Sequence, residues 1–82
     1  MIDKTSMYSL KEFNDSKVSI ILDDVVKALE ERDYNATNQL VGYLMSGDPG
    51  YISSYKDARK KITSVDRSLI IEYLLKYKLG DK

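Results

Sequence analysis

The chain has 82 residues, of which 43% are hydrophobic and 32% are charged, with thirteen basic residues balancing thirteen acidic ones. This length fits one domain, and the balanced charge provides no overall field that would draw the protein to nucleic acid or to an anionic membrane. The absence of Cys and His excludes a disulfide framework and a thiolate metal site, and it removes the side chain most used for proton transfer. We therefore expect a folded cytoplasmic protein without cofactor, metal, membrane insertion or enzymatic activity.

Residues 1–15 lack a regular hydrophobic period. Isolated apolar side chains alternate there with polar ones, and they fit neither a helix nor a strand for long. We therefore predict an N-terminal arm over residues 1–15 and a single helical domain over residues 16–82. The apolar residues that can anchor this arm weakly are Met7, Tyr8, Leu10 and Phe13.

The first predicted helix runs from Ser16 to Arg32. Its apolar residues recur every three or four positions, which places them in one stripe along an amphipathic helix. Asp15 or Ser16 can cap the amides of its first turn. The stripe consists of Val18, Leu22, Val25 and Leu29.

A second, shorter helix is predicted from an N-cap at Asn35 to about Met45. Gly47 suits the left-handed position after a helix, Asp48 suits an N-cap, and Pro49 suits the first residue of the next turn. The segment 46–50 also has the outline of a phosphate-binding loop, but it lacks the Gly-Lys-Ser/Thr ending of such loops. A tight interhelical turn is therefore the preferred interpretation.

A third helix is predicted from Ser53 to Ile62. Its four cations form a candidate docking surface for an anion or an acidic partner, although Asp57 lies within the cluster. Because a Gly-containing turn precedes this helix, the segment also has the outline of a helix-turn-helix, and a dimeric nucleic-acid-binding protein is the alternative function. The cations are Lys56, Arg59, Lys60 and Lys61.

The last predicted helix runs from Val65 to Leu79, with Thr63 or Ser64 as its cap and Gly80 at its end. One broad apolar face and a second, narrower one follow its length. A domain of this size has too few other elements to cover both faces. We therefore expect an all-α, compact bundle of four to five short helices that forms a homodimer. The residues expected in the dimer interface are Ile71, Leu75 and Leu79.

The densest motif covers residues 34–59, which read Tyr-Asn-Ala-Thr-Asn-Gln-Leu-Val-Gly-Tyr-Leu-Met-Ser-Gly-Asp-Pro-Gly-Tyr-Ile-Ser-Ser-Tyr-Lys-Asp-Ala-Arg. This pattern resembles the IreB family of bacterial regulatory phosphoproteins, and the likeness extends more loosely over nearly the whole chain. The family usually has Pro where this chain has Ala36 and Ser53, a change that relaxes two helix starts without removing a chemical group. The motif residues singled out are Gly42, Tyr43, Ser46, Gly47, Asp48, Pro49, Tyr51, Tyr55 and Arg59.

The resemblance implies a small helical homodimer that acts as a signalling intermediate in the cell-wall stress response. It implies three partners besides a second copy: a transmembrane Ser/Thr kinase with extracellular PASTA repeats, its cognate phosphatase, and a downstream protein that the motif does not identify. By position, Thr5 matches the phosphoacceptor of the family, which precedes an aromatic residue, here Tyr8, by three positions. Ser6 and Ser9 remain competing acceptors.

A phosphate on Thr5 would add about −1.5 to −2 charges. Residues 1–33 already hold eight acidic residues against five basic ones. The phosphate is therefore expected either to be repelled by that half of the chain or to be drawn to the cations of the predicted third helix.

Overall fold

The computed structural model describes the backbone of residues 4–80 and the side chains of residues 14–80. Within these residues every regular element is helical, which confirms the all-α class, although the first helix is long rather than short. None of the helices in residues 4–80 combines the length and the apolar composition needed to cross a bilayer. The elements are α1 (Lys4–Glu31), α2 (Ala36–Ser46), the 3-10 turns η1 (Pro49–Tyr51) and η2 (Tyr55–Asp57), α3 (Ala58–Ile62) and α4 (Arg67–Leu79).

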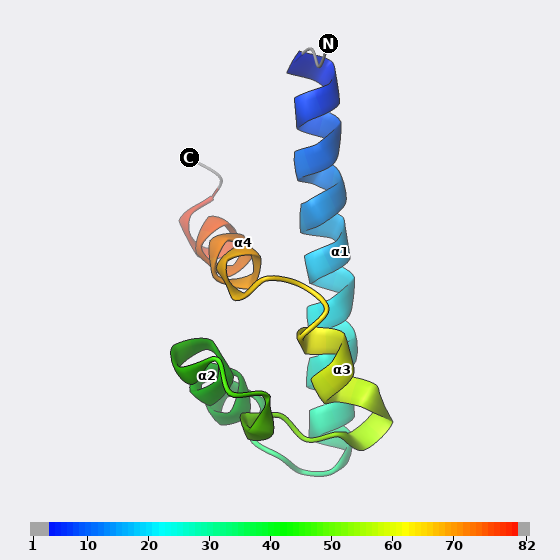
Figure 1. Cartoon of the computed structure of the whole chain (residues 1–82), viewed down its shortest axis with the longest axis vertical. Coiled ribbons are helices and arrows are strands. Elements are labelled where there is room, and N and C mark those ends of the chain that lie inside the picture. Colours follow the sequence, from blue (N-terminus) through cyan, green and yellow to red (C-terminus); the bar gives the residue numbers. More distant parts are fainter. Residues whose placement is uncertain (1–3, 81–82) are drawn as a thin grey trace.

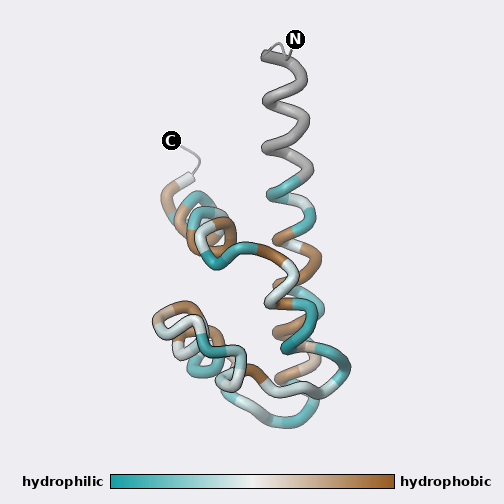
Figure 2. Tube along the Cα trace, viewed as in Figure 1, coloured by the Kyte–Doolittle hydropathy of each residue, from teal (hydrophilic) through white to brown (hydrophobic). Residues whose placement is uncertain are grey.

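Helix α1 organises the molecule, which measures 45 × 24 × 22 Å (Figure 1). α3 lies against the C-terminal half of α1, and α2 and α4 lie on one side of it. The predicted stripe of α1 is confirmed as the centre of the core, since Val18, Leu22, Val25 and Leu29 are all buried. Along the coloured part of α1 in Figure 2, brown apolar segments alternate with teal polar ones. The other elements complete the core with Tyr43, Ile52, Ala58, Ile62, Val65 and Ile70.

Helix α1 begins at Lys4, so the predicted start near Ser16 is wrong. Residues 4–15 are helical, although their apolar residues follow no regular period. These residues contain neither Pro nor Gly. Extending an existing helix adds one hydrogen bond per residue without repeating the cost of nucleation. A weak hydrophobic period therefore did not prevent the packed helix from continuing towards its N-terminus.

Helix α2 and the turn after it agree with the prediction. The Asn35 side chain accepts a hydrogen bond from the amide of Asn38 at 3.0 Å. Gly47 ends the helix with a left-handed φ of 76°, and Asp48 caps η1 with Pro49 at its first position. The predicted tight turn between two helical elements is confirmed.

The predicted helix from Ser53 to Ile62 is wrong in its first half. Residues 55–57 form the separate turn η2, and α3 has only five residues. The break occurs at Lys56 and Asp57, whose φ values of 49° and 61° lie in the left-handed region. A five-residue helix packed on α1 is too short to present a row of side chains to a DNA groove, so the helix-turn-helix alternative loses its structural basis.

Helix α4 begins at Arg67, not at Val65, and Asp66 occupies its N-cap position. The predicted caps are wrong because the hydroxyls of Thr63 and Ser64 instead donate to carbonyls at the end of α3. Val65 is buried, so it anchors the link between the two helices. The predicted end at Gly80 is confirmed.

Candidate functional site

The motif of residues 34–59 packs on itself. An added Cβ on Gly42 would lie 2.3 Å from the ring of Tyr51, so the aromatic ring lies directly on the backbone of α2. Two residues further along the chain, the amide of Ser53 donates to the Gln39 side chain at 3.0 Å. Both contacts fold the segment that follows α2 back onto that helix.

A second set of contacts fixes the end of α2. The Ser46 hydroxyl donates to the carbonyl of Gly42 at 2.7 Å and accepts from the amide of Asp48 at 3.0 Å. The Arg67 guanidinium donates to the carbonyl of Leu44 at 3.0 Å. A Cβ on Gly47 would lie 2.8 Å from the guanidinium carbon and would displace it, and the left-handed backbone with φ 76° favours Gly at this position.

The remaining motif residues also have contacts inside the chain. Tyr43 is buried, and Arg59 Nε donates to the carbonyl of Ile52 at 2.8 Å. The motif therefore encodes a folded unit in which its polar residues hold α2, η1 and the residues that follow η1 together. Gln39 was not singled out from the sequence, because a Gln in a helix gives no signal of a bond to a backbone amide fourteen residues away.

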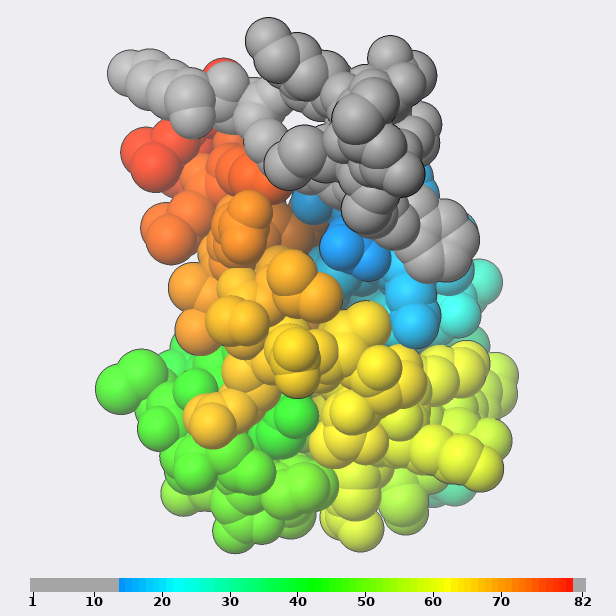
Figure 3. All heavy atoms as spheres, turned by 45° about the horizontal axis from the view of Figure 1, so that its top comes forward, coloured from blue at the N-terminus to red at the C-terminus, as the bar shows by residue number. Residues whose placement is uncertain are grey.

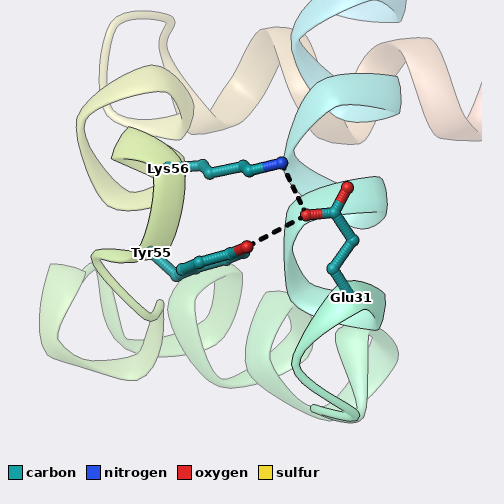
Figure 4. Close-up of polar contacts among 3 residues, drawn as sticks. All are labelled: Glu31, Tyr55 and Lys56. Carbon is teal, nitrogen blue, oxygen red and sulfur yellow. Dashed lines mark hydrogen bonds and ion pairs between the residues drawn. The ribbon is translucent and has the colours of Figure 1, made fainter.

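A polar cluster joins the C-terminal end of α1 to η2 (Figure 4). Lys56 Nζ lies 2.8 Å from Glu31 Oε2, and the Tyr55 hydroxyl donates to the same oxygen at 3.2 Å. The Arg32 guanidinium lies over the Tyr55 ring, 4.4 Å from its centroid. The hydrogen bond from Lys56 lowers the pKa of Glu31, and the same bond raises the pKa of Lys56.

The four predicted docking cations do not form one free surface. Lys56 pairs with Glu31, and Lys61 lies 3.7 Å from Asp24, so both turn towards α1. Arg59 is bonded to a backbone carbonyl, as described above. Among the described side chains, only Lys60 of the four has no such contact. Three of the four predicted docking cations thus have partners within the chain, and their role in docking stays a prediction.

Thr5 is the second residue of α1, and its side chain lies outside the described residues. Glu31, which holds Lys56, lies 26 residues further along the same helix. At 1.5 Å per residue the two positions are about 39 Å apart. A phosphate on Thr5 therefore cannot reach the cations of η2 and α3 in its own chain while α1 remains helical.

Helix α4 leaves its narrower apolar face uncovered. Its other side faces the core through Leu69, Ile70 and Tyr73. The broad face predicted from the helical period consists of Leu69, Ile70, Tyr73, Leu74 and Tyr77. The structure confirms it only in part, because Leu74 and Tyr77 are exposed. The residues of the second face, Ile71, Leu75 and Leu79, are 40%, 54% and 60% exposed.

The uncovered side of α4 continues towards α2. Figure 3 shows α4, in orange to red, and α2, in green, along the same side of the molecule. Ile71 and Leu44 line one hollow of about 410 Å³ with polar residues from the start of α4. Lys76 lies at the junction with α1, 3.7 Å from Asp15 and 3.1 Å from Glu72. The second face of α4 is thus an apolar surface accessible to another molecule.

A comparison with protein families gives a match over almost the whole chain. The model of the family described as IreB regulatory phosphoprotein matches residues 3–80. This range includes the motif, the apolar face of α4 and the N-terminal turn that contains Thr5.

Proposed function

Because the chain belongs to the IreB family of regulatory phosphoproteins, we propose that it is a cytoplasmic, non-enzymatic regulator controlled by phosphorylation near its N-terminus. The family match over residues 3–80 is the observation that carries this proposal. The contacts of the motif support it, since the side chains of Gln39 and Arg59 are engaged in bonds to the backbone that hold the fold together.

The proposed modifying enzymes are a transmembrane Ser/Thr kinase of the PASTA type and its cognate phosphatase, and the proposed setting is the cell-wall stress response. Thr5 is the proposed acceptor, ahead of Ser6 and Ser9. A kinase needs access to an extended segment, and the end of a helix opens at a lower cost than its interior. Once modified, Thr5 would place negative charge in the first turn of α1, where the helix dipole favours it.

The proposed mode of action is protein binding by a homodimer. The exposed face of Ile71, Leu75 and Leu79 supports this proposal, because a two-fold axis can pair such a face with its copy and remove apolar area from water. A downstream protein would then bind the dimer with an affinity that depends on the phosphorylation of the N-terminal turns.

Incubation with a PASTA-type kinase tests the phosphorylation proposal. Mass spectrometry should locate phosphate on Thr5, and Thr5→Ala should lose most of it, while Ser6→Ala and Ser9→Ala should retain it. Phosphate found only beyond residue 15 would contradict the proposal.

Analytical ultracentrifugation tests the dimer separately. A dimer is expected at micromolar concentration, and Leu75→Asp should give monomers because it would bury an unpaired carboxylate. Tyr77→Asp is the control that should remain dimeric, because Tyr77 is 82% exposed and lies about 160° around the same helix from Leu75. A monomeric wild type would remove the dimer from the proposal and leave the phosphorylation test unaffected.

A further inference from the structure

The break between η2 and α3 contains two consecutive residues other than Gly with a left-handed backbone. Lys56 has φ 49° and ψ 37°, and Asp57 has φ 61° and ψ 22°. Left-handed conformations are disfavoured for residues other than Gly, and two in succession need support from their surroundings. Residues 53–62 have the sequence pattern of one continuous helix. Local bonds nevertheless support the break, since the Ser53 hydroxyl accepts from the Tyr55 amide at 3.2 Å and the Arg59 amide donates to the Ser53 carbonyl at 3.1 Å.

Further support comes from α1. The Glu31 carboxylate pairs with the ammonium group of Lys56 and accepts a hydrogen bond from the hydroxyl of Tyr55 (Figure 4). The guanidinium of Arg32 covers the ring of Tyr55. The carboxylate lies 25 residues before Lys56 in the chain, so it is a tertiary partner that local preference does not include. The broken backbone and the Glu31 contacts therefore depend on each other.

The continuous helix is a compatible alternative for the core. In it, Tyr55, Ala58 and Ile62 would occupy positions i, i+3 and i+7 and share one face. Ala58 and Ile62 are the buried residues of α3, so this face would still point at α1. Lys56 would not lie on this face, because it follows Tyr55 directly and successive residues of a helix point about 100° apart.

The same helix would also change the charged surface. Lys56, Arg59 and Lys60 would occupy positions i, i+3 and i+4, which are neighbours on one helix face. In the observed conformation Lys56 is instead directed to Glu31. The continuous helix would thus assemble a row of cations that the broken form separates.

We propose that residues 53–57 form a latch with two states, in which Glu31 holds the broken form and keeps Lys56 away from Arg59 and Lys60. In the released state, residues 53–62 form one helix with a basic face. That face fits an acidic peptide segment, whose carboxylates replace Glu31 as partners of Lys56. In the latched state Glu31 competes with the acidic peptide for Lys56.

The proposal is tested with Glu31→Ala and with Glu30→Ala as its control. Glu30 is the exposed neighbour of Glu31 on α1, so its removal changes the net charge equally without touching Lys56. NMR chemical shifts of the Cα and carbonyl carbons should show Lys56 and Asp57 changing to right-handed helix in Glu31→Ala only. Lys56→Gln, which breaks the pair from the other side, should produce the same change at Asp57, while Lys60→Gln should not.

Binding of poly-glutamate is the second readout. Glu31→Ala should bind the peptide several-fold more tightly than Glu30→Ala, and adding Lys56→Ala should abolish that difference. Left-handed shifts that persist in both Glu31→Ala and Lys56→Gln would overturn the proposal. Chemical shifts of unfolded chain over residues 53–57 in Glu31→Ala would also overturn it. Equal affinity of Glu31→Ala and Glu30→Ala for poly-glutamate would overturn it as well.

Discussion

Helix α2 with its following turn and the segment of residues 53–62 lie next to each other in the chain, yet their backbones are determined in different ways. Around α2, Asn35, Gly47 and Asp48 have the conformations that their own chemistry favours. In residues 53–62 the chain instead adopts two left-handed residues against its preference, next to a carboxylate from α1. Local signals define the first region, whereas in the second a tertiary contact to Glu31 adds to the local hydrogen bonds.

Gly47→Ala should have the largest effect among the substitutions that test this comparison. The left-handed backbone costs a residue with Cβ roughly 1–2 kcal/mol, and the Cβ would also displace the Arg67 guanidinium that holds Leu44. Adding a lost hydrogen bond at an exposed site, about 1 kcal/mol, we expect the free energy of unfolding to fall by about 2–3 kcal/mol. Urea denaturation followed by circular dichroism measures it.

Gly80→Ala is the matched control, because Gly80 has a similar φ of 80° but its Cβ would meet no described atom within 4 Å. It should cost only the backbone term of roughly 1–2 kcal/mol, or less at a helix end. Equal losses for the two variants would show that the Arg67 contact contributes nothing.

Asn35→Ala should have an intermediate effect on the locally defined region. It removes the side chain that accepts from the Asn38 amide at 3.0 Å, and the loss of such a cap costs about 1 kcal/mol. Thr37→Ala, an exposed residue in the same first turn, should change stability little. If denaturation gives the same midpoint for both variants, the cap does not determine where α2 begins.

The difference between the two regions explains which parts of the structure the sequence predicts. The end of α2 at Gly47 and the stripe of α1 follow from patterns contained within a few turns. The left-handed backbone at Lys56 requires knowledge that Glu31 lies beside it, and no local pattern contains that information. The extension of α1 to Lys4 was missed because helix propagation needs no hydrophobic period once the helix has formed.

The candidate site shows the same division. The sequence identified the apolar face with Ile71 and Leu75, because a helical period separates it from the core face, and both residues are exposed. It did not identify the engagement of Lys56 and Lys61, because both partners lie on α1. Clusters of charge in a sequence therefore indicate a surface only when no other element supplies the opposite charges.

Asp57→Gly should have a small effect of opposite sign in the second region. Gly removes the left-handed penalty of roughly 1–2 kcal/mol, and its greater freedom in the unfolded chain costs roughly 0.5–1 kcal/mol. We expect stability to rise by about 0.5 kcal/mol. Lys60→Gly, in the right-handed part of α3, should instead lower it by about 1 kcal/mol. A loss of stability in both variants would indicate that Asp57 is not held in the left-handed conformation.

The smallest expected effect is a pH dependence confined to the contact between Glu31 and Lys56. The hydrogen bond from Lys56, with smaller contributions from Tyr55 and from the charge of Lys27, lowers the pKa of Glu31 below its ordinary range. A carboxyl group whose pKa is lower in the folded state stabilises that state above its unfolded pKa. This contribution is lost as the pH falls through the folded pKa.

For Lys56 the sign is reversed. Its raised pKa gives a contribution that is present below the unfolded pKa and is lost as the pH rises through the folded value. The contact should therefore persist across the neutral range and fail at both extremes. Because both side chains are exposed, solvent screens the pair and the effect on global stability should be slight.

The NMR titration of the Glu31 carboxyl carbon measures this effect directly. Its midpoint should lie below that of an unfolded Glu, and Lys56→Met should raise it, whereas Lys61→Met, which removes the partner of Asp24, should leave it unchanged. If the pair determines the backbone, the Cα shift of Asp57 should follow the same midpoint, because protonated Glu31 no longer binds Lys56 strongly. An Asp57 shift that stays constant while Glu31 titrates would mean that packing, not the ion pair, holds the break in residues 53–62. The backbone of this region would then be independent of Glu31, as the turn after α2 is.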